Sequence, residues 1–288
     1  MKVTKAVIPA AGFGTRVLPA SKAVPKEMLP IVDKPSIQYI VEEAAASGIE
    51  DILIILSRGK DAIEDHFDRN PVLEKALEKP GKEKYLESVL FPTQLANIYF
   101  IRQPEQKGLG HAVSFAKSFV GDDPFVVLYG DDVIINKEYP VAKQLIDAYG
   151  EYQLPALGIK EVTAEQILKY SSMKVKPLHD NYYFVDDMIE KPAPDKILSL
   201  YSILGRVLLT KDVFPILANL KPGAGGELQL TDAIKELAHG KGTVGVDFVG
   251  RRYDMGNKLE MMKAAVEVAL THEEIGADFR AYLKTLAL

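Results

Sequence analysis

Short apolar runs alternate along the first half of the chain with segments whose apolar residues recur at helical spacing. Val3–Ile8 is such a run and ends at a proline, which is typical of a buried strand. The same patterns predict further strands over Ile52–Leu56, Ile98–Ile101 and Phe125–Tyr129, and helices over Pro35–Ser47 and His111–Phe119. Because strands that alternate with helices form βαβ units, we predict an α/β fold with a Rossmann-like, mixed but mostly parallel sheet flanked by helices.

The second half of the chain has a mixed pattern. Thr163–Gln166 has the form of a capping box that opens a short helix, and Tyr182–Met188 and Ser202–Leu209 have the composition of strands. Apolar residues at helical spacing predict a late amphipathic helix through Leu259, Met262, Val266 and Leu270. The charged stretch Leu73–Glu87 predicts a solvated helix. With no internal repeat and no long flexible linker, the simplest interpretation is a single domain over residues 1–288.

Composition narrows the function classes. Hydrophobic residues make up 47% of the 288 residues and charged residues 26%, as in ordinary globular proteins. The net charge of −5 predicts no nucleic-acid partner and no attraction to anionic membranes. The chain contains no cysteine, which excludes disulfides and thiol catalysis. No apolar run is long enough to span a bilayer, and the N-terminus lacks the pattern of a signal peptide, so we predict a cytoplasmic location.

A glycine-containing loop directly follows the first predicted strand. Glycines there allow backbone N–H groups to approach phosphate oxygens, and Arg16 adds donors for the same anion. The residues that we predict to bind the nucleotide phosphates are Ala10, Ala11, Gly12, Gly14 and Thr15. A dinucleotide-binding loop needs a glycine where this chain has Val17, which argues against an NAD(P)-dependent dehydrogenase.

The segment after this loop is irregular and cationic. Leu18–Pro30 contains three prolines, and Lys22 and Lys26 join Arg16 close to the glycine loop. A triphosphate must be neutralised before its phosphorus can be attacked, so cations in this place suit a nucleoside triphosphate. Lys26, which a proline precedes, is the leading candidate.

The stretch Pro9–Pro35, with its Pro-Lys-Glu-Met-Leu-Pro wording, resembles the signature of sugar-nucleotide pyrophosphorylases, in particular the bacterial UTP–glucose-1-phosphate uridylyltransferases. Similar segments extend over Val3–Phe67, Ile101–Asp132, Glu190–Pro192 and Ile203 to about Ala269. The resemblance implies a single nucleotidyltransferase domain, in which about 1–150 bind the nucleotide and about 151–288 bind the sugar phosphate. It also implies Mg²⁺ dependence, the formation of UDP-glucose and pyrophosphate from UTP and glucose 1-phosphate, and a homo-oligomer (dimer or tetramer).

The resemblance assigns roles to residues of the nucleotide part. Gln103 and Gly108 match the glutamine and glycine that contact the uracil ring. We expect His111, in the same motif, to cap or pack the following helix. Asp131, which follows the strongest predicted strand, matches the family's metal-binding aspartate, and Asp254 matches the second ligand.

Three further residues match family positions that bind the sugar phosphate: Lys191, Gly205 and Glu227. The chain departs from the family's pattern at Ser171, where relatives commonly carry a glycine, and over Ser199–Ser202. Both departures fall in the acceptor region, so a uridylyl- or thymidylyltransferase for another hexose 1-phosphate stays open.

The resulting hypothesis is an in-line displacement at the α-phosphorus. Arg16 and Lys26 neutralise the triphosphate, Lys191 orients the acceptor, and Mg²⁺ bound by Asp131 and Asp254 stabilises the charge. The alternative from another class is a non-catalytic sugar-nucleotide sensor. It would require a degraded metal or lysine site, which the sequence does not show.

Overall fold

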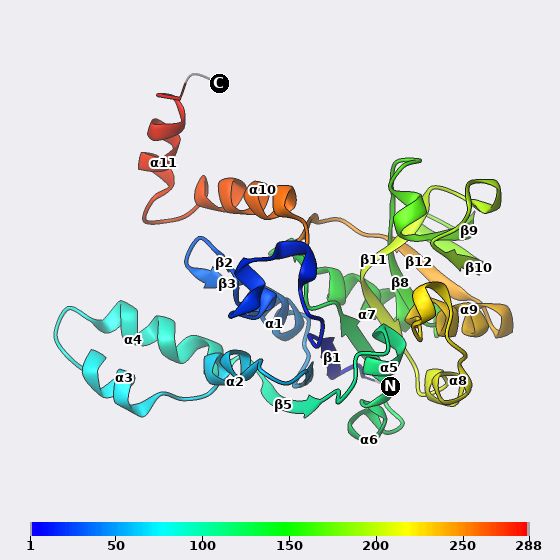
Figure 1. The fold of residues 1–288 in the computed structure, drawn as a ribbon, viewed down its shortest axis with the longest axis horizontal. Coiled ribbons are helices and arrows are strands. Elements are labelled where there is room, and N and C mark those ends of the chain that lie inside the picture. The colour runs from blue at the N-terminus through cyan, green and yellow to red at the C-terminus, as the bar shows by residue number, and fades with distance from the viewer. Residues whose placement is uncertain (1, 287–288) are drawn as a thin grey trace.

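A single large sheet organises the molecule (Figure 1). The computed structural model describes residues 2–286, the side chain of Ala224 excepted, so the outermost residues of the predicted domain 1–288 lie outside the described part. Within residues 2–286 this sheet has nine strands, in the order β5 (Asn97–Arg102), β4 (Asp51–Leu56), β1 (Lys5–Pro9), β6 (Phe125–Leu128), β11 (Tyr201–Leu209), β8 (Ala156–Glu161), β12 (Thr243–Asp247), β10 (Tyr182–Glu190) and β9 (Ser171–Pro177).

The strand directions confirm the predicted mixed, mostly parallel sheet. The strands β5, β4, β1 and β6 are parallel neighbours, as are β12 and β8. In the described sheet only β11 and β10 run against the common direction, because each pairs antiparallel with both of its neighbours. The carboxyl ends of β1, β4, β5 and β6 therefore meet at one edge, where α/β sheets bind ligands.

Helices flank this sheet, and short strand pairs accompany it. The helices of residues 2–286 are α1 (Ser36–Ala46), α2 (Asp61–Phe67), α3 (Pro71–Leu77), α4 (Glu83–Leu90), α5 (Leu109–Ser114), α6 (Lys117–Val120), α7 (Val141–Tyr152), α8 (Val213–Asn219), α9 (Leu230–Gly240), α10 (Lys258–Ala269) and α11 (Gly276–Leu283). The pairs are β7 (Asp132–Ile135) with β13 (Arg251–Asp254), and β2 (Pro30–Ile31) with β3 (Lys34–Pro35). No helix of the described residues combines the length and apolarity needed to cross a membrane.

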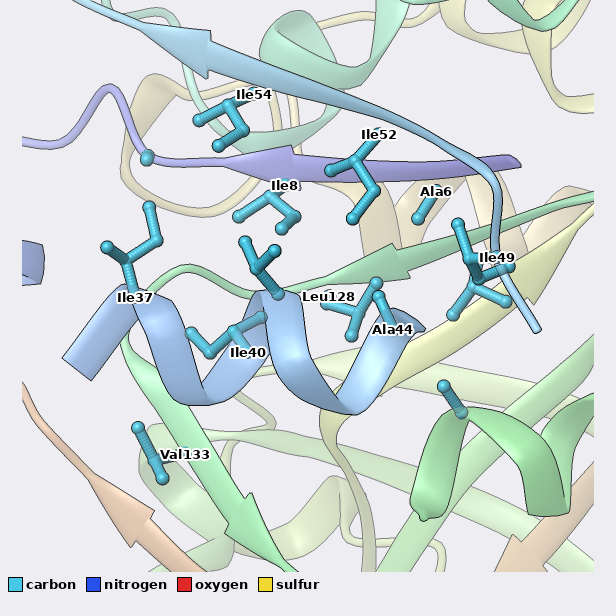
Figure 2. Packing of buried hydrophobic residues seen from close by; sticks show 14 of the residues in the cluster. Ala6, Ile8, Ile37, Ile40, Ala44, Ile49, Ile52, Ile54, Leu128 and Val133 are labelled. Carbon is cyan, nitrogen blue, oxygen red and sulfur yellow. The ribbon is translucent and has the colours of Figure 1, made fainter. Parts of the chain in front are cut away.

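The packing of α1 on the sheet explains why the first third of the chain folds as predicted (Figure 2). Ile37, Ile40 and Ala44 lie on one face of α1 and are fully buried against Ile8 of β1 and its neighbours. Burial of each large aliphatic side chain contributes roughly 1.5–3 kcal/mol. This cluster fixes β1 and β6 beneath the loops that carry the candidate site.

The structure differs from the sequence-based expectations at three helices. The stretch predicted as one helix over Leu73–Glu87 is two helices, α3 and α4, which project from the sheet as a hairpin because Pro80 and Gly81 interrupt the chain (Figure 1). The helix predicted over His111–Phe119 is likewise divided, into α5 and α6. The predicted late helix exists as α10, but three of the residues that predicted it, Leu259, Met262 and Val266, are exposed. Its buried residues are Ala264 and Ala269.

Candidate active site

The predicted phosphate loop joins the end of β1 to a short 3-10 turn, η1 (Thr15–Val17). The N–H of Ala10 donates to the carbonyl of Ile55 (2.8 Å), which ties the start of the loop to β4. Gly12 and Gly14 lie against the side chain of Lys26. The structure thus brings Lys26 to the glycine loop, as the cationic segment predicts.

Asp131 reaches the same loop through Gly130. The Gly130 N–H donates to the Pro9 carbonyl (3.3 Å), and a Cβ at Gly130 would lie only 2.7 Å from that oxygen. Only a residue without a side chain permits this approach, so Gly130 lets the end of β6 lie beside the loop that follows β1.

Two carboxylates and two cations form a charge centre here. Lys26 Nζ lies 2.6 Å from Asp131 Oδ2, and Arg16 Nη2 lies 3.4 Å from the same oxygen. Arg16 Nη1 donates to Asp254 Oδ2 at 3.1 Å. One guanidinium therefore connects the carboxylates of Asp131 and Asp254, 123 residues apart in the sequence.

The pairing of β7 with β13 explains this convergence. The two strands are antiparallel, with Asp254 opposite Asp132. The N–H of Met255 donates to the Asp131 carbonyl (2.8 Å), and the N–H of Gly256 donates to Asp254 Oδ1 (2.8 Å). The sequence does not show that Asp131 and Asp254 lie together, and the structure does.

The charges keep Asp131 ionised. Burial acts to raise the pKa of the Asp131 carboxyl, but Lys26 and Arg16 outweigh it and hold this pKa below its usual value. The neighbouring Asp132 behaves differently: burial raises its pKa, although Arg252 Nη2 lies 2.6 Å from Oδ1. Asp132 thus has its own ion pair beside the charge centre.

A buried ion pair supports the loop from below. Lys60 Nζ donates to Glu27 Oε1 (2.8 Å) and Oε2 (2.7 Å), and also to the carbonyl of Ala10. Both side chains are almost fully buried. Because Glu27 directly follows Lys26, this pair anchors both the cationic segment and the start of the phosphate loop.

The predicted base motif lies at the end of β5. Gln103 is buried, and its Nε2 contacts both the carbonyl of Gly108 (3.4 Å) and His111 Nδ1 (2.9 Å). His111 packs edge-on against Phe115, as expected, but its bond to Gln103 was not predicted.

The base motif also contacts a sugar motif. Gly108 has a φ of +105°, and a Cβ there would lie 2.7 Å from the Leu228 carbonyl and 2.9 Å from Glu227 Cβ. The N–H of Leu228 donates to the Lys107 carbonyl (2.8 Å). The loop carrying Glu227 is therefore fastened to the loop that follows Gln103.

The other two sugar-phosphate candidates connect to this region. Gly205 lies against the Asp132 carboxylate, next to the charge centre. Lys191 is exposed on a backbone with a φ of +47°, and its N–H donates to the Tyr170 carbonyl (2.8 Å). Burial raises the pKa of Glu190, and the charges of Lys191 and Glu227 also act on this carboxyl.

The two departures from the family pattern contact each other. Ser171 Oγ lies 3.2 Å from Ser202 Oγ and accepts a hydrogen bond from the N–H of Ile203 (3.3 Å). Both serines are buried. The Ser171 hydroxyl thus has its partners inside the protein.

The comparisons with known proteins agree with this geometry. A family model described as nucleotidyl transferase matches residues 5–270. The chain belongs to the nucleotidyl transferase family. It is 49% identical to UTP–glucose-1-phosphate uridylyltransferase 2 of Staphylococcus saprophyticus, over 100% of this chain and 99% of that relative. It is 48% identical to the UTP–glucose-1-phosphate uridylyltransferase YngB of Bacillus subtilis, over 98% of this chain and 95% of the relative.

Solved structures of this family superpose over nearly the whole chain. A UDP-glucose pyrophosphorylase complexed with UDP-glucose has a TM-score of 0.84 at 37% identity and covers 99% of this chain and 100% of its own. A UTP-bound UGPase from Acinetobacter baumannii has a TM-score of 0.88 at 34% identity and covers 99% of both chains. These similarities confirm the resemblance and the fold class inferred from the motifs.

Sequence reasoning missed the residues that hold the site together. Glu27 stands inside a matched motif but was given no role, and Lys60 was not considered, although it closely follows the buried strand β4 at the ligand-binding edge. Arg206 is fully buried and pairs with Glu43 of α1 (Nη2 to Oε2, 2.6 Å). This pair fixes β11, next to Gly205, to α1. A charged residue within a buried strand is the signal that would have found Arg206.

Proposed function

We propose that this chain transfers the uridylyl group of UTP to glucose 1-phosphate and releases UDP-glucose and pyrophosphate. The observation that carries the proposal is the charge centre: Asp131 and Asp254 share Arg16, and Lys26 pairs with Asp131, beside a phosphate loop at the carboxyl edge of the sheet. Relatives that match nearly the full length bear the name of this activity, and solved neighbours hold UDP-glucose or UTP.

The chemistry needs positioning and charge neutralisation more than proton transfer. A sugar 1-phosphate is already ionised at neutral pH, so its oxygen can attack the α-phosphorus without a general base. Arg16 and Lys26 are paired with aspartates, and a triphosphate would offer them phosphate oxygens instead. Lys191 would bind the phosphate of the incoming sugar and align it for in-line displacement.

Mg²⁺ is the cofactor that we propose. Within residues 2–286 there is no group of three or more His, Cys, Asp or Glu side chains that could hold a metal alone. Mg²⁺ is commonly bound by one or two carboxylates together with substrate phosphates and waters, so Asp131 and Asp254 would suffice. Both carboxylates contact the guanidinium of Arg16, which supports a shared cation site between them. Bound there, the metal would supply positive charge toward the leaving pyrophosphate.

We also propose a division of labour between the two parts of the chain. Residues 1 to about 150 supply the phosphate loop and Gln103. Residues from about 151 to 288 supply Lys191, Gly205 and Glu227. Asp254 crosses this division, since β13 returns it to the nucleotide side. The cytoplasmic location and the homo-oligomeric assembly stay predictions from the sequence.

Phosphorus NMR of the reaction mixture tests the proposal. With UTP, glucose 1-phosphate and Mg²⁺, we expect UDP-glucose and pyrophosphate to appear in equal amounts, and EDTA to stop the reaction. Asp131→Asn and Asp254→Asn should each lower kcat by roughly 10²-fold, the scale of losing one electrostatic stabiliser. Asp122→Asn, at an exposed surface pair, is the matched control. Orthophosphate in place of pyrophosphate would contradict the proposed reaction, and undiminished turnover in EDTA would contradict the metal.

A further inference from the structure

The side-chain amide of Gln103 has both of its N–H groups committed inside the protein. Its Nε2 lies 2.9 Å from His111 Nδ1 and 3.4 Å from the carbonyl oxygen of Gly108. An amide nitrogen carries two hydrogens, and these two contacts use both of them. Within residues 2–286 no group donates a hydrogen bond to the oxygen of this amide, Oε1. Gln103 can therefore offer a ligand only an acceptor.

The two contacts also fix which way the amide points. A carbonyl oxygen can only accept, so the nitrogen of Gln103, and not its oxygen, must face Gly108. His111 accepts at Nδ1, which places its own proton on Nε2. The Gly108 carbonyl therefore sets the sense of the amide, and the shorter contact with His111 adds a second hydrogen bond that restrains the amide in this orientation.

Uracil and cytosine differ at the atom that such an acceptor would meet. The ring N3 of uracil carries a hydrogen and donates, whereas N3 of cytosine has a lone pair and accepts. An amide oxygen pairs with the first and repels the second. A free amide could turn over and present its N–H groups to cytosine, so discrimination requires that the amide be held.

We propose that His111 is a specificity-determining positioning residue: it holds the Gln103 amide with Oε1 toward the base, so that the site selects uracil over cytosine. The inference rests on the proposed function, in which Gln103 reads the base. His111 acts through Gln103 and needs no contact with the nucleotide.

The surroundings keep His111 in place. Its ring packs edge-on against Phe115, with centroids 5.0 Å apart at 82°. The start of its helix is tied down, because the N–H of Gly110 donates to the Leu228 carbonyl at 2.8 Å. The ring nitrogen that accepts from Gln103 is thus held in place by its surroundings, and the amide is oriented before any nucleotide binds.

Two variants separate orientation from packing. His111→Phe keeps an aromatic ring against Phe115 but has no acceptor, and His111→Asn keeps an acceptor near the position of Nδ1. For each we would measure kcat/KM with UTP, CTP and 5-methyluridine triphosphate, whose base has the same N3–H as uracil. His111→Phe should lower the UTP/CTP ratio about three- to tenfold, the range for one net hydrogen bond. It should leave the UTP/5-methyluridine triphosphate ratio unchanged, and His111→Asn should keep both ratios near wild type.

The outcomes are distinct. An equal loss with all three nucleotides would mean that His111 only supports the fold, which overturns the inference. If His111→Phe does not fold, His111→Ala, which also lacks the acceptor, repeats the comparison. If Gln103→Ala lowers the UTP/CTP ratio and neither His111 variant does, Gln103 reads the base but His111 does not orient it. A wild-type enzyme that transfers no nucleotide would instead contradict the proposed function itself.

Discussion

Replacing Lys60 by methionine would remove the cation from beneath the phosphate loop and leave Glu27 without its partner. The Lys60 ammonium contacts both oxygens of the Glu27 carboxylate, at 2.8 and 2.7 Å, and both side chains are more than nine-tenths buried. Burial raises the pKa of Glu27 and lowers the pKa of Lys60, so neither charge is stable there alone. Breaking such a buried pair costs about 3–5 kcal/mol of unfolding free energy.

Equilibrium unfolding in urea measures this cost. We expect Lys60→Met to lower the unfolding midpoint strongly, and the double variant Lys60→Met/Glu27→Met to cost less than the sum of the two single changes, because no charge then stays buried. Lys2→Met is the matched control, since it breaks an exposed Lys–Glu pair and should cost less than about 1 kcal/mol. A loss below about 1 kcal/mol for Lys60→Met, or strict additivity in the double variant, would refute the reasoning.

Four further substitutions test other parts of the molecule. Lys191→Ala should raise mainly KM for glucose 1-phosphate, and Lys26→Ala should impair the use of UTP; steady-state kinetics with each substrate varied would contradict the assignment if the effects were exchanged. Ser171→Gly should cost about 1–2 kcal/mol in urea unfolding, because it removes the contact with the Ser202 hydroxyl and leaves the N–H of Ile203 without its acceptor. A gain in glucose 1-phosphate turnover would show that Ser171 crowds the sugar instead. Burial lowers the pKa of the His66 imidazole in the folded protein below its value in the unfolded chain, about 6.5. The contribution of the neutral imidazole to the unfolding free energy is therefore present above about pH 6.5, and it is lost as the pH falls through the pKa of the folded state. The unfolding free energy should therefore fall more steeply between about pH 7 and pH 5 in the wild type than in His66→Gln, and parallel curves would contradict this.

The fold was predictable where one periodic pattern decided both the element and its burial. Ile52–Leu56 is β4 and Pro35–Ser47 contains α1, because their apolar residues face the same core. The pattern failed where the surface that an element packs against lies far away in the sequence. Leu259 and Met262 mark the helix α10 but are exposed in it, so helical spacing did not predict what they contact.

The candidate site divides in the same way. Lys26 and Asp131 were predicted from local motifs beside strand ends, and Lys26 Nζ lies 2.6 Å from Asp131 Oδ2 in the structure. The proximity of Asp254 depends on the pairing of β7 with β13, which no local pattern specifies. Lys60 escaped notice because a lysine after a strand usually reaches solvent, and its burial depends on Glu27, 33 residues earlier.

The most direct test of the central proposal is kcat/KM of the wild-type enzyme, measured by pyrophosphate release with Mg²⁺ for each pairing of a nucleotide with a sugar phosphate. The nucleotides would be UTP, CTP and dTTP, and the acceptors the 1-phosphates of glucose, galactose and N-acetylglucosamine. We predict the highest value for UTP with glucose 1-phosphate. Another pair that is used at least as well, or no release of pyrophosphate from any pair, would contradict the proposal.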